Sequence, residues 1–281
     1  MIVDLHTHST ASDGSVSPGQ LVKLAKRAGI SILAITDHDT QAGVAEAMGA
    51  GRPTGVEVVP GVELSLEHDS GGMHLVVLWL EPGSGPLQDR LSELQSGRTP
   101  RNERIVELLN ESGMPLTMDE VLEESGDGTV GRPHIAAVMA RHGYVPDIRA
   151  AFDLWLARGR PAYVGRPRLE PEVAIDLARS SGAVPVLAHP HTLGITTARE
   201  MAALLERLRD AGLVGLEALY ASYHRHEREG YSDLARRFGL EVSGGSDYHG
   251  AYKPGLELGT GYGDLVVPDV LAEELRKWAH R

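Results

Sequence analysis

The sequence predicts an α/β fold in which about seven strands close into a barrel, with a block of helices inserted after the fourth strand. Three observations lead to this prediction. Short, nearly continuous apolar runs alternate with helical patterns, which is typical of a parallel sheet covered on both faces. This alternation stops between residues 82 and 167, where helical patterns follow one another. Histidines and acids recur where apolar runs end, as expected at the carboxyl edge of a barrel.

The first part of the barrel opens with a strand at residues 2–6. Ser17, Pro18 and Gln20 then form the N-terminal signature of a helix that ends at Gly29. The remaining elements of this part are a small helix at 41–48 and strands at 32–36, 56–64 and 73–80.

The last part of the chain returns to the same rhythm. Three helices each precede a strand, the helices at 171–181, 198–211 and 227–238 and the strands at 183–189, 213–220 and 240–245; a final helix covers 268–279. We therefore expect residues 1–82 and 168–281 to form the barrel and residues 83–167 to form the insertion. Helices are expected within the insertion at 101–112, 118–125, 133–142 and 147–158.

The composition excludes several classes of protein. The chain has no cysteine, so disulfides, zinc–thiolate sites and cysteine nucleophiles are ruled out, and any metal must be held by His, Asp or Glu. The net charge of −12 disfavours a broad surface for long nucleic acids. The segment from Arg98 to Arg168 is neutral and rich in arginine, which favours anion recognition there. Without a signal-peptide pattern or a membrane-length apolar run, we expect a cytoplasmic protein with no membrane contact and no obligatory protein partner.

Side chains that bind metals gather at or near the ends of the predicted strands. They are His6, His8, Asp13, His38, Glu63, His74, His189, Asp247 and His249. Alternate residues of a strand point to one face, so His6 and His8 can reach the same ion. Burying so many acids and imidazoles would be costly unless cations neutralised them. Asp37, next to His38, is expected to orient a ligand from behind.

This donor set is too large for one ion and predicts two or three divalent ions. Imidazole and carboxylate ligands without sulfur suit Mn²⁺, Fe²⁺ or Zn²⁺. Two such ions close together form the usual clamp for the cleavage of a phosphate ester.

The motifs DLHTHSTASDGS, AITDHDT, GVELS, LAHP and GGSDYHG, which span residues 4 to 250, resemble those of the PHP (polymerase and histidinol phosphatase) family. The chain is similar to the stand-alone branch that acts on nucleotides, whose helical insertion carries an RxxR-type pattern and GRPH, as at residues 101–104 and 131–134 here. The resemblance implies a distorted (β/α)7 barrel with a helical cap, and ions of the Mn²⁺ type.

The resemblance also implies a division of the ligands among the ions. It assigns His6, His8, Glu63 and Asp247 to one ion and Asp13, His38, His189 and His249 to another. His74, together with Glu63, would hold a third.

The expected reaction is hydrolysis of a phosphomonoester by a hydroxide that bridges two ions. The leaving oxygen needs a proton or a cation, which a third ion, His191 or His224 could supply. Arginine suits phosphate and can stack on a base, so contacts to the substrate are expected from Arg101, Asn102, Arg104, Arg132 and His134. Alternatively, Arg101 and Arg104 lie on an exposed helix face, paired with Glu103 or Glu107.

Several functional hypotheses remain open. The first is a phosphatase that acts on a small phosphorylated nucleotide, such as a 3',5'-bisphosphonucleotide (pAp) or AMP. The second is a 5'-3' exonuclease on short RNA or DNA that uses the same ions. A histidinol-phosphate-type phosphatase and a non-catalytic metal-binding module are further alternatives. The net charge of −12, with only 2 Phe and 8 Tyr to stack on bases, favours the small substrate.

Overall fold

The computed structural model describes residues 2–69, 71–96, 98–126, 130–165 and 168–280. One sheet runs in chain order through β1 (Ile2–Asp4), β2 (Ile30–Ile35), β3 (Glu57–Leu66), β4 (Met73–Leu78), β5 (Val184–Leu187), β6 (Gly215–Tyr220) and β7 (Glu241–Gly245). The sheet curls until it is nearly closed. The predicted α/β barrel is therefore confirmed.

The segments that follow β1 and β7 meet and almost close the barrel. The amide of His8 donates to the carbonyl of Tyr248 at 2.9 Å, and the amide of Asp247 donates to the carbonyl of His6 at 2.8 Å. A Cβ added to Gly245 would lie 2.5 Å from the backbone nitrogen of His6, so this approach requires glycine. The closure brings residues 6–8 beside residues 247–249.

The expectation of a wholly parallel sheet is wrong at one strand. β4 runs antiparallel to both β3 and β5, whereas the other neighbouring strands are parallel. The physical reason is the short connection at residues 67–72, because a parallel crossover needs a dozen or more residues. The start of β4 consequently lies at the same edge of the sheet as the carboxyl ends of β3 and β5. This reversal puts His74, the second residue of β4, at the edge of the sheet where β3 and β5 end.

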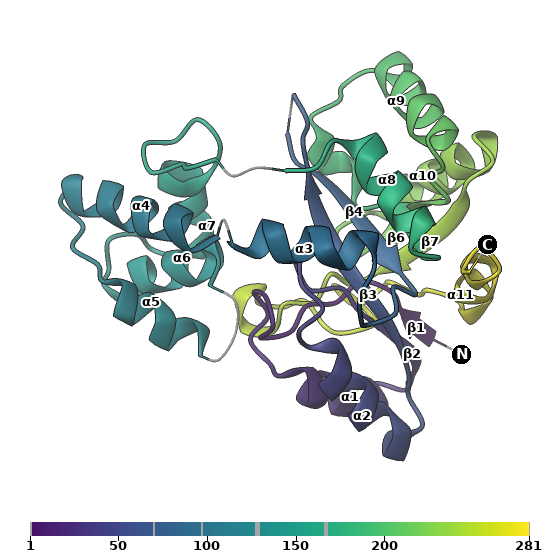
Figure 1. Cartoon of the computed structure of the whole chain (residues 1–281), viewed down its shortest axis with the longest axis horizontal. Helices are drawn as coiled ribbons and strands as arrows, with labels where there is room; N and C mark the ends of the chain where they lie inside the picture. Colours follow the sequence, from purple (N-terminus) through teal and green to yellow (C-terminus); the bar gives the residue numbers. More distant parts are fainter. Residues whose placement is uncertain (1, 70, 97, 127–129, 166–167, 281) are drawn as a thin grey trace.

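Helices cover the outside of the sheet (Figure 1). They are α1 (Pro18–Arg27), α2 (Val44–Thr54), α3 (Pro86–Ser96), α8 (Pro171–Ser180), α9 (Ala198–Asp210), α10 (Arg225–Arg237) and α11 (Asp269–Arg276). At the start of α1, the side chain of Ser17 accepts from the amide of Gln20, which confirms the predicted cap. Sequence analysis predicts no helix at α3.

Helix α3 belongs to the barrel in its packing, although sequence analysis assigns residues 83–167 to the insertion. Leu87, Leu91 and Leu94 share one buried apolar cluster with residues of β3, β4 and α8. The helices with a separate core begin after α3.

The insertion forms a helical cap, defined here as the described residues 98–126 and 130–165. It consists of α4 (Arg98–Glu111), α5 (Met118–Ser125), α6 (Arg132–Arg141) and α7 (Ile148–Ala151), which continues into a π-helical turn at Phe152–Leu156. Its own apolar core includes Ile105, Leu109 and Val138. Figure 1 shows the cap beside the barrel, joined to it by few chain segments.

Among the described residues, hydrogen bonds from Tyr252 and Arg158 join the cap to the barrel. Tyr252, in the short 3-10 helix η3 (Gly250–Tyr252) after β7, donates from its hydroxyl to Oε1 of Glu124 in α5 at 3.2 Å. Arg158 donates from the cap to the carbonyl of His68 at 2.9 Å. The cap therefore overhangs the edge of the sheet that carries the histidines.

Across the described ranges, none of the helices combines the length and the apolar character that crossing a bilayer requires.

Candidate functional site

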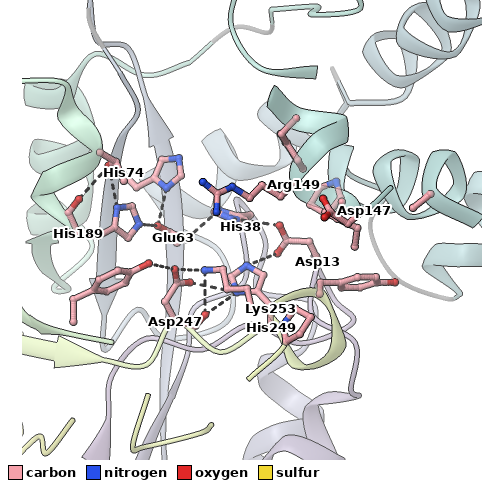
Figure 2. A pocket seen from close by; sticks show the side chains of 18 residues that line it. Asp13, His38, Glu63, His74, Asp147, Arg149, His189, Asp247, His249 and Lys253 are labelled. Atoms are coloured by element: carbon pink, nitrogen blue, oxygen red, sulfur yellow. Dashed lines mark hydrogen bonds and ion pairs between the residues drawn. The ribbon is translucent and has the colours of Figure 1, made fainter. Parts of the chain in front are cut away.

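All nine predicted ligands lie together at the edge of the barrel beneath the cap. Together with Glu217, their imidazole and carboxylate atoms form four groups, each with its donor atoms within 4.8 Å of one another. The groups are His6, His8, Glu63 and Asp247; His8, Asp13, His38 and His249; His38, Glu63 and His74; and His6, His189 and Glu217. Figure 2 shows several of these side chains converging on Glu63 and Asp247. We refer to the nine predicted side chains as the donor cluster; Glu217 is treated separately below.

The grouping differs from the one that the family resemblance implies. The first implied set is present as a group, and His74 lies with Glu63 as implied. His8, not His189, completes the group of Asp13, His38 and His249. His189 instead contacts Glu63, with its Nε2 atom 2.9 Å from Oε1. His189 follows β5, which adjoins β4, and its ring centroid lies 5.1 Å from that of His74.

Glu63 is the centre of the donor cluster. Its Oε1 atom lies 2.8 Å from Nδ1 of His74, and its Oε2 atom lies 3.2 Å from Nε2 of His6 and 3.1 Å from Nε2 of His8. Glu63 can face both sides of the cluster because it lies inside the long strand β3, between β2 and β4, and not at its end.

Three buried atoms of the donor cluster are well suited to cations. Among the described residues, none forms a hydrogen bond with Nε2 of His6, Nε2 of His8 or Oε2 of Glu63. Nε2 of His6 lies 3.2 Å and Nε2 of His8 lies 3.1 Å from Oε2 of Glu63. A buried polar atom without a hydrogen bond is costly, and a divalent cation would satisfy all three lone pairs at once. The residues present therefore fit a metal centre.

The electrostatics of the metal-free cluster support the same conclusion. Burial opposes protonation of His6, but the carboxylates of Glu217, Glu63 and Asp247 outweigh it and raise the pKa of His6 well above its usual value. Burial likewise opposes protonation of His8, and Asp247 and Glu63 raise its pKa to about 9. His6 and His8 thus favour positive charge, whereas burial lowers the pKa of His38 to about 3 and also lowers the pKa of His249.

The carboxylate of Asp247 experiences a different balance. Burial raises its pKa, but the ammonium of Lys253 and the neighbouring imidazoles outweigh this effect and hold the pKa well below the usual range. Asp247 therefore stays ionised and available as a ligand.

Two buried acids support the cluster from behind. Glu217 in β6 is 2% exposed, accepts from Nδ1 of His6 at 2.9 Å and accepts from the amide of His189 at 2.7 Å. The first bond directs Nε2 of His6 toward Glu63. Sequence analysis missed Glu217, although a lone acid in the apolar run LVGLEALY was a signal that could have found it.

Asp37 supports the cluster through the loop after β1. It accepts from the amide and the hydroxyl of Ser9 and, at 2.6 Å, from the hydroxyl of Ser12. These bonds hold the loop that presents Asp13. Asp37 thus fixes the loop of Asp13, a predicted ligand, whereas it was expected to orient His38.

The backbone is strained at two members of the cluster. His189 and Asp247 have φ angles of 24° and 54°, in the left-handed region that favours glycine. Such conformations cost about 1–3 kcal/mol and persist where the surrounding structure enforces them, often at functional sites.

A cavity of about 720 Å³ lies between the donor cluster and the cap. Part of its lining consists of Asp13, His38, Glu63 and other cluster residues. An apolar region of the lining is formed by Pro133, Ala140, Ile148 and Phe152 from the cap and by Tyr252 and Pro254 from the barrel. Figure 2 shows Arg149 extending from the cap into this cavity and Lys253 beside Asp247. Sequence analysis missed both of these cations.

Arg101 and Arg132 line a smaller adjoining cavity of about 180 Å³, which shares Asp13, His38 and His74 with the main one. The guanidinium of Arg101 donates to Oδ1 of Asn102 at 2.7 Å. The structure thus places two of the predicted arginines close to the donor cluster.

The other predicted substrate residues have structural partners. Asn102 is buried and donates to the carbonyl of Val130 at 3.0 Å. His134 is buried, and its Nδ1 atom accepts from the amide of Gly131 at 3.0 Å at the start of α6. Arg104 is exposed and pairs with Glu107 at 2.8 Å, so it occupies the exposed helix face that was the alternative prediction.

The two candidate proton donors lie outside the residues that line the main cavity. His191 is beside it, with Nδ1 3.0 Å from the hydroxyl of Tyr223 and its ring 5.4 Å from that of Tyr220. His224 is exposed at the N-terminus of α10.

Comparison with known proteins identifies relatives along almost the whole chain. The model of the PHP domain matches residues 4–130. The chain is 34% identical to a 5'-3' exoribonuclease of Haemophilus influenzae, covering 88% of this chain and 89% of the relative. It is 30% identical to a 3',5'-nucleoside bisphosphate phosphatase of Chromobacterium violaceum, covering 92% and 90%.

A solved structure shares the architecture. The crystal structure of a provisionally assigned metal-dependent phosphoesterase from Bifidobacterium adolescentis superposes with a TM-score of 0.86 at 29% identity, covering 98% of this chain and 96% of that one. Together with the donor cluster, these similarities confirm the predicted resemblance: the chain belongs to the PHP family.

Proposed function

We propose that this chain, a metal-dependent phosphoesterase of the PHP family, removes a phosphate from a small nucleotide such as a 3',5'-bisphosphonucleotide (pAp) or AMP. The observation that carries the proposal is the cavity of about 720 Å³ that is lined both by the donor cluster and by an apolar region of the cap. Its volume of about 720 Å³ lies within the usual range for small-molecule sites.

The donor cluster is proposed to hold two or three divalent ions, with Mn²⁺ as the first candidate and Fe²⁺ or Zn²⁺ as alternatives. The nine predicted ligands supply imidazole and carboxylate donors, which suit these metals. When bound, such ions lower the pKa of water and offset the charge of phosphate oxygens.

The residues of the cavity would position the nucleotide around this centre. The apolar region contains Phe152, Tyr252 and Pro254, which are suited to pack against a nucleobase. The guanidinium of Arg149 is exposed and suits a second phosphate. Arg101 and Arg132, in the adjoining cavity, are further candidates for phosphate contacts.

A second candidate function is 5'-3' exonuclease activity on short RNA or DNA. It is favoured by the exoribonuclease of Haemophilus influenzae, which is 34% identical to this chain. The two functions differ in the substrate that enters the cavity and share the same donor cluster.

A substrate comparison tests the proposal. Purified protein loaded with Mn²⁺ is assayed with pAp, AMP, histidinol phosphate and a 5'-phosphorylated oligonucleotide. Release of inorganic phosphate from pAp or AMP, with a higher kcat/KM than on the oligonucleotide, supports the proposal. Stepwise release of mononucleotides from the oligonucleotide as the dominant activity would replace it with the exonuclease. Failure of the Mn²⁺-loaded protein to cleave any phosphoester would favour a non-catalytic module.

A further inference from the structure

Lys253 is the sole lysine among the described residues that line the main cavity. It is the residue after η3, and η3 directly follows the loop that carries Asp247 and His249. Its side chain is 33% exposed, because it borders the cavity and not the core. The chain contains only four lysines in all, so a cation at this position stands out.

Asp247 uses its two carboxylate oxygens differently. Oδ1 faces the donor cluster, 3.2 Å from Nε2 of His8 and 3.5 Å from Nε2 of His6. Oδ2 faces away from these imidazoles and is contacted by the hydroxyl of Tyr220 at 2.8 Å and by the ammonium of Lys253. Lys253 is therefore held next to the cluster without occupying the side of Asp247 that faces it.

The ammonium of Lys253 has donor capacity to spare. An ammonium carries three N–H groups. Within the described part of the chain, Lys253 donates to Oδ2 of Asp247 and, at 3.3 Å, to the main-chain carbonyl of the same residue. One N–H remains for a ligand in the cavity that Lys253 lines.

The neighbours of Lys253 in the chain locate that ligand atom. Tyr252 and Pro254, on either side of it, line the apolar region in which the nucleoside is proposed to bind. Asp247, which Lys253 contacts, belongs to the donor cluster at which the phosphate is proposed to bind. In the proposed complex, the oxygen that joins the phosphorus to the nucleoside lies between the phosphate and the nucleoside, and Lys253 lines the same cavity beside residues of both regions.

We propose that Lys253 is a catalytic residue that donates a charge-assisted hydrogen bond to the ester oxygen that leaves phosphorus. The inference rests on the proposed hydrolysis of a phosphomonoester. In that reaction the oxygen of water forms a bond to phosphorus, the bond from phosphorus to the ester oxygen breaks, and its electron pair stays on that oxygen. A proton from water then yields the alcohol and inorganic phosphate. Lys253 keeps its own proton and stabilises the negative charge while it develops.

This assignment supplies a charge for the leaving group from a residue that lines the cavity. Sequence analysis assigned the role to His191, His224 or a third ion. Neither histidine is among the residues that line the main cavity. A fixed ammonium needs no change of protonation during the reaction, and its effect should depend on how basic the leaving oxygen is.

The test uses the Mn²⁺-loaded full chain with Lys253 replaced by Met or by Arg. Lys277, which is exposed on α11 and pairs with Glu274, provides the matched control K277M. Substrates are pAp and a series of aryl phosphates from p-nitrophenyl phosphate, whose leaving group is a weak base, to phenyl phosphate, whose leaving group is a stronger one. Metal content, thermal unfolding and the binding of inorganic phosphate are measured on every variant.

We expect K253M to lower kcat about 100-fold on phenyl phosphate and pAp, but less than about fivefold on p-nitrophenyl phosphate. K253R should retain part of the activity, and K277M should match the wild type. Metal content and the unfolding temperature of K253M should be unchanged, and phosphate affinity should change less than kcat.

Three outcomes would overturn the inference. The first is an equal loss of kcat in K253M along the whole aryl phosphate series, and the second is an unchanged activity of K253M on phenyl phosphate. The third is a loss of activity that is proportional to a loss of bound metal, which would mean that Lys253 only supports Asp247. The aryl series keeps this inference separate from the nucleotide proposal. A wild type that cleaves aryl phosphates but neither pAp nor AMP refutes the proposed substrate, and the dependence on the leaving group still decides the role of Lys253.

Discussion

Replacement of Glu217 by Gln tests whether the buried acid behind the donor cluster governs metal binding. The carboxylate accepts from Nδ1 of His6 at 2.9 Å and from the amide of His189 at 2.7 Å, and it is 2% exposed. A Gln side chain has nearly the same shape, so the fold should survive. The negative charge that makes His6 a stronger ligand is lost, and the amide can present its nitrogen to His6 in place of an oxygen.

The size of the effect follows from the role of such supporting acids. Removing the partner of a ligating histidine weakens metal binding about 10–100-fold. This corresponds to about 1.4–2.7 kcal/mol of binding free energy. We therefore expect the Kd for Mn²⁺ to rise by that factor in E217Q. Phosphatase activity should fall at limiting Mn²⁺ and recover when excess Mn²⁺ is added.

The measurement is isothermal titration of the metal-free protein with Mn²⁺, together with activity as a function of Mn²⁺ concentration. Glu273→Gln, an exposed substitution on α11, is the control for loss of one acidic charge. Wild-type affinity in E217Q would refute the reasoning, because the hydrogen bond to His6 would then not influence the ligand. A lower unfolding temperature with unchanged Mn²⁺ affinity would reduce Glu217 to a structural role.

Three further predictions concern pH, substrate and closure of the barrel. In the metal-free protein the pKa of His8 is raised to about 9, compared with about 6.5 in the unfolded chain. Protonation of His8 therefore contributes its full stabilisation of the fold below about pH 6.5, and this contribution is lost as the pH rises through about 9. Because Mn²⁺ must displace that proton, the affinity of the protein for Mn²⁺ should rise from pH 6 to pH 8, and binding should release protons. Calorimetry in buffers of different ionisation enthalpy measures both quantities. An affinity for Mn²⁺ that does not depend on pH would contradict this prediction. Arg149→Ala should raise KM for pAp about tenfold with little change in stability, because the exposed guanidinium of Arg149 lines the cavity. The control Arg104→Ala should behave as the wild type. Equal KM values of Arg149→Ala and the wild type in steady-state assays would exclude Arg149 from substrate binding. Gly245→Ala should destabilise the fold by about 1–3 kcal/mol, because the new Cβ would lie 2.5 Å from the backbone of His6; an unchanged urea midpoint would show that the strands can separate at no cost.

Several features of the fold were predictable because they depend on local sequence. The capping box of Ser17 and Gln20 marks the start of α1, and α5 forms at residues 118–125 as expected. The apolar runs of the strands are long enough to identify each strand without knowledge of its partners. Most of the nine candidate ligands were predictable for a related reason: residues that follow parallel strands must meet at one edge, whatever the details of packing. Glu63 and His74, which lie within β3 and β4, are the exceptions.

Other features depend on which segments become neighbours, and residue patterns carry little information about this. The direction of β4 followed from the short connection at residues 67–72, and it decides that His74 meets Glu63. The allocation of His189 and His8 among the donor groups depends on strand order and backbone conformation at each residue. Helix α3 packs on the barrel because its leucines meet the apolar cluster of β3, β4 and α8.

The sequence by itself determined the class of fold, the donor cluster and the family, because periodic apolar patterns and the residues at strand ends can be recognised within short segments of the chain. Only the tertiary structure decided that Glu217 stands behind His6, that Lys253 and Arg149 face the same cavity, and that Arg104 faces solvent. The reason is that a lone charged residue has no periodic pattern. Its role depends on the distance and burial that folding creates between segments far apart in the chain.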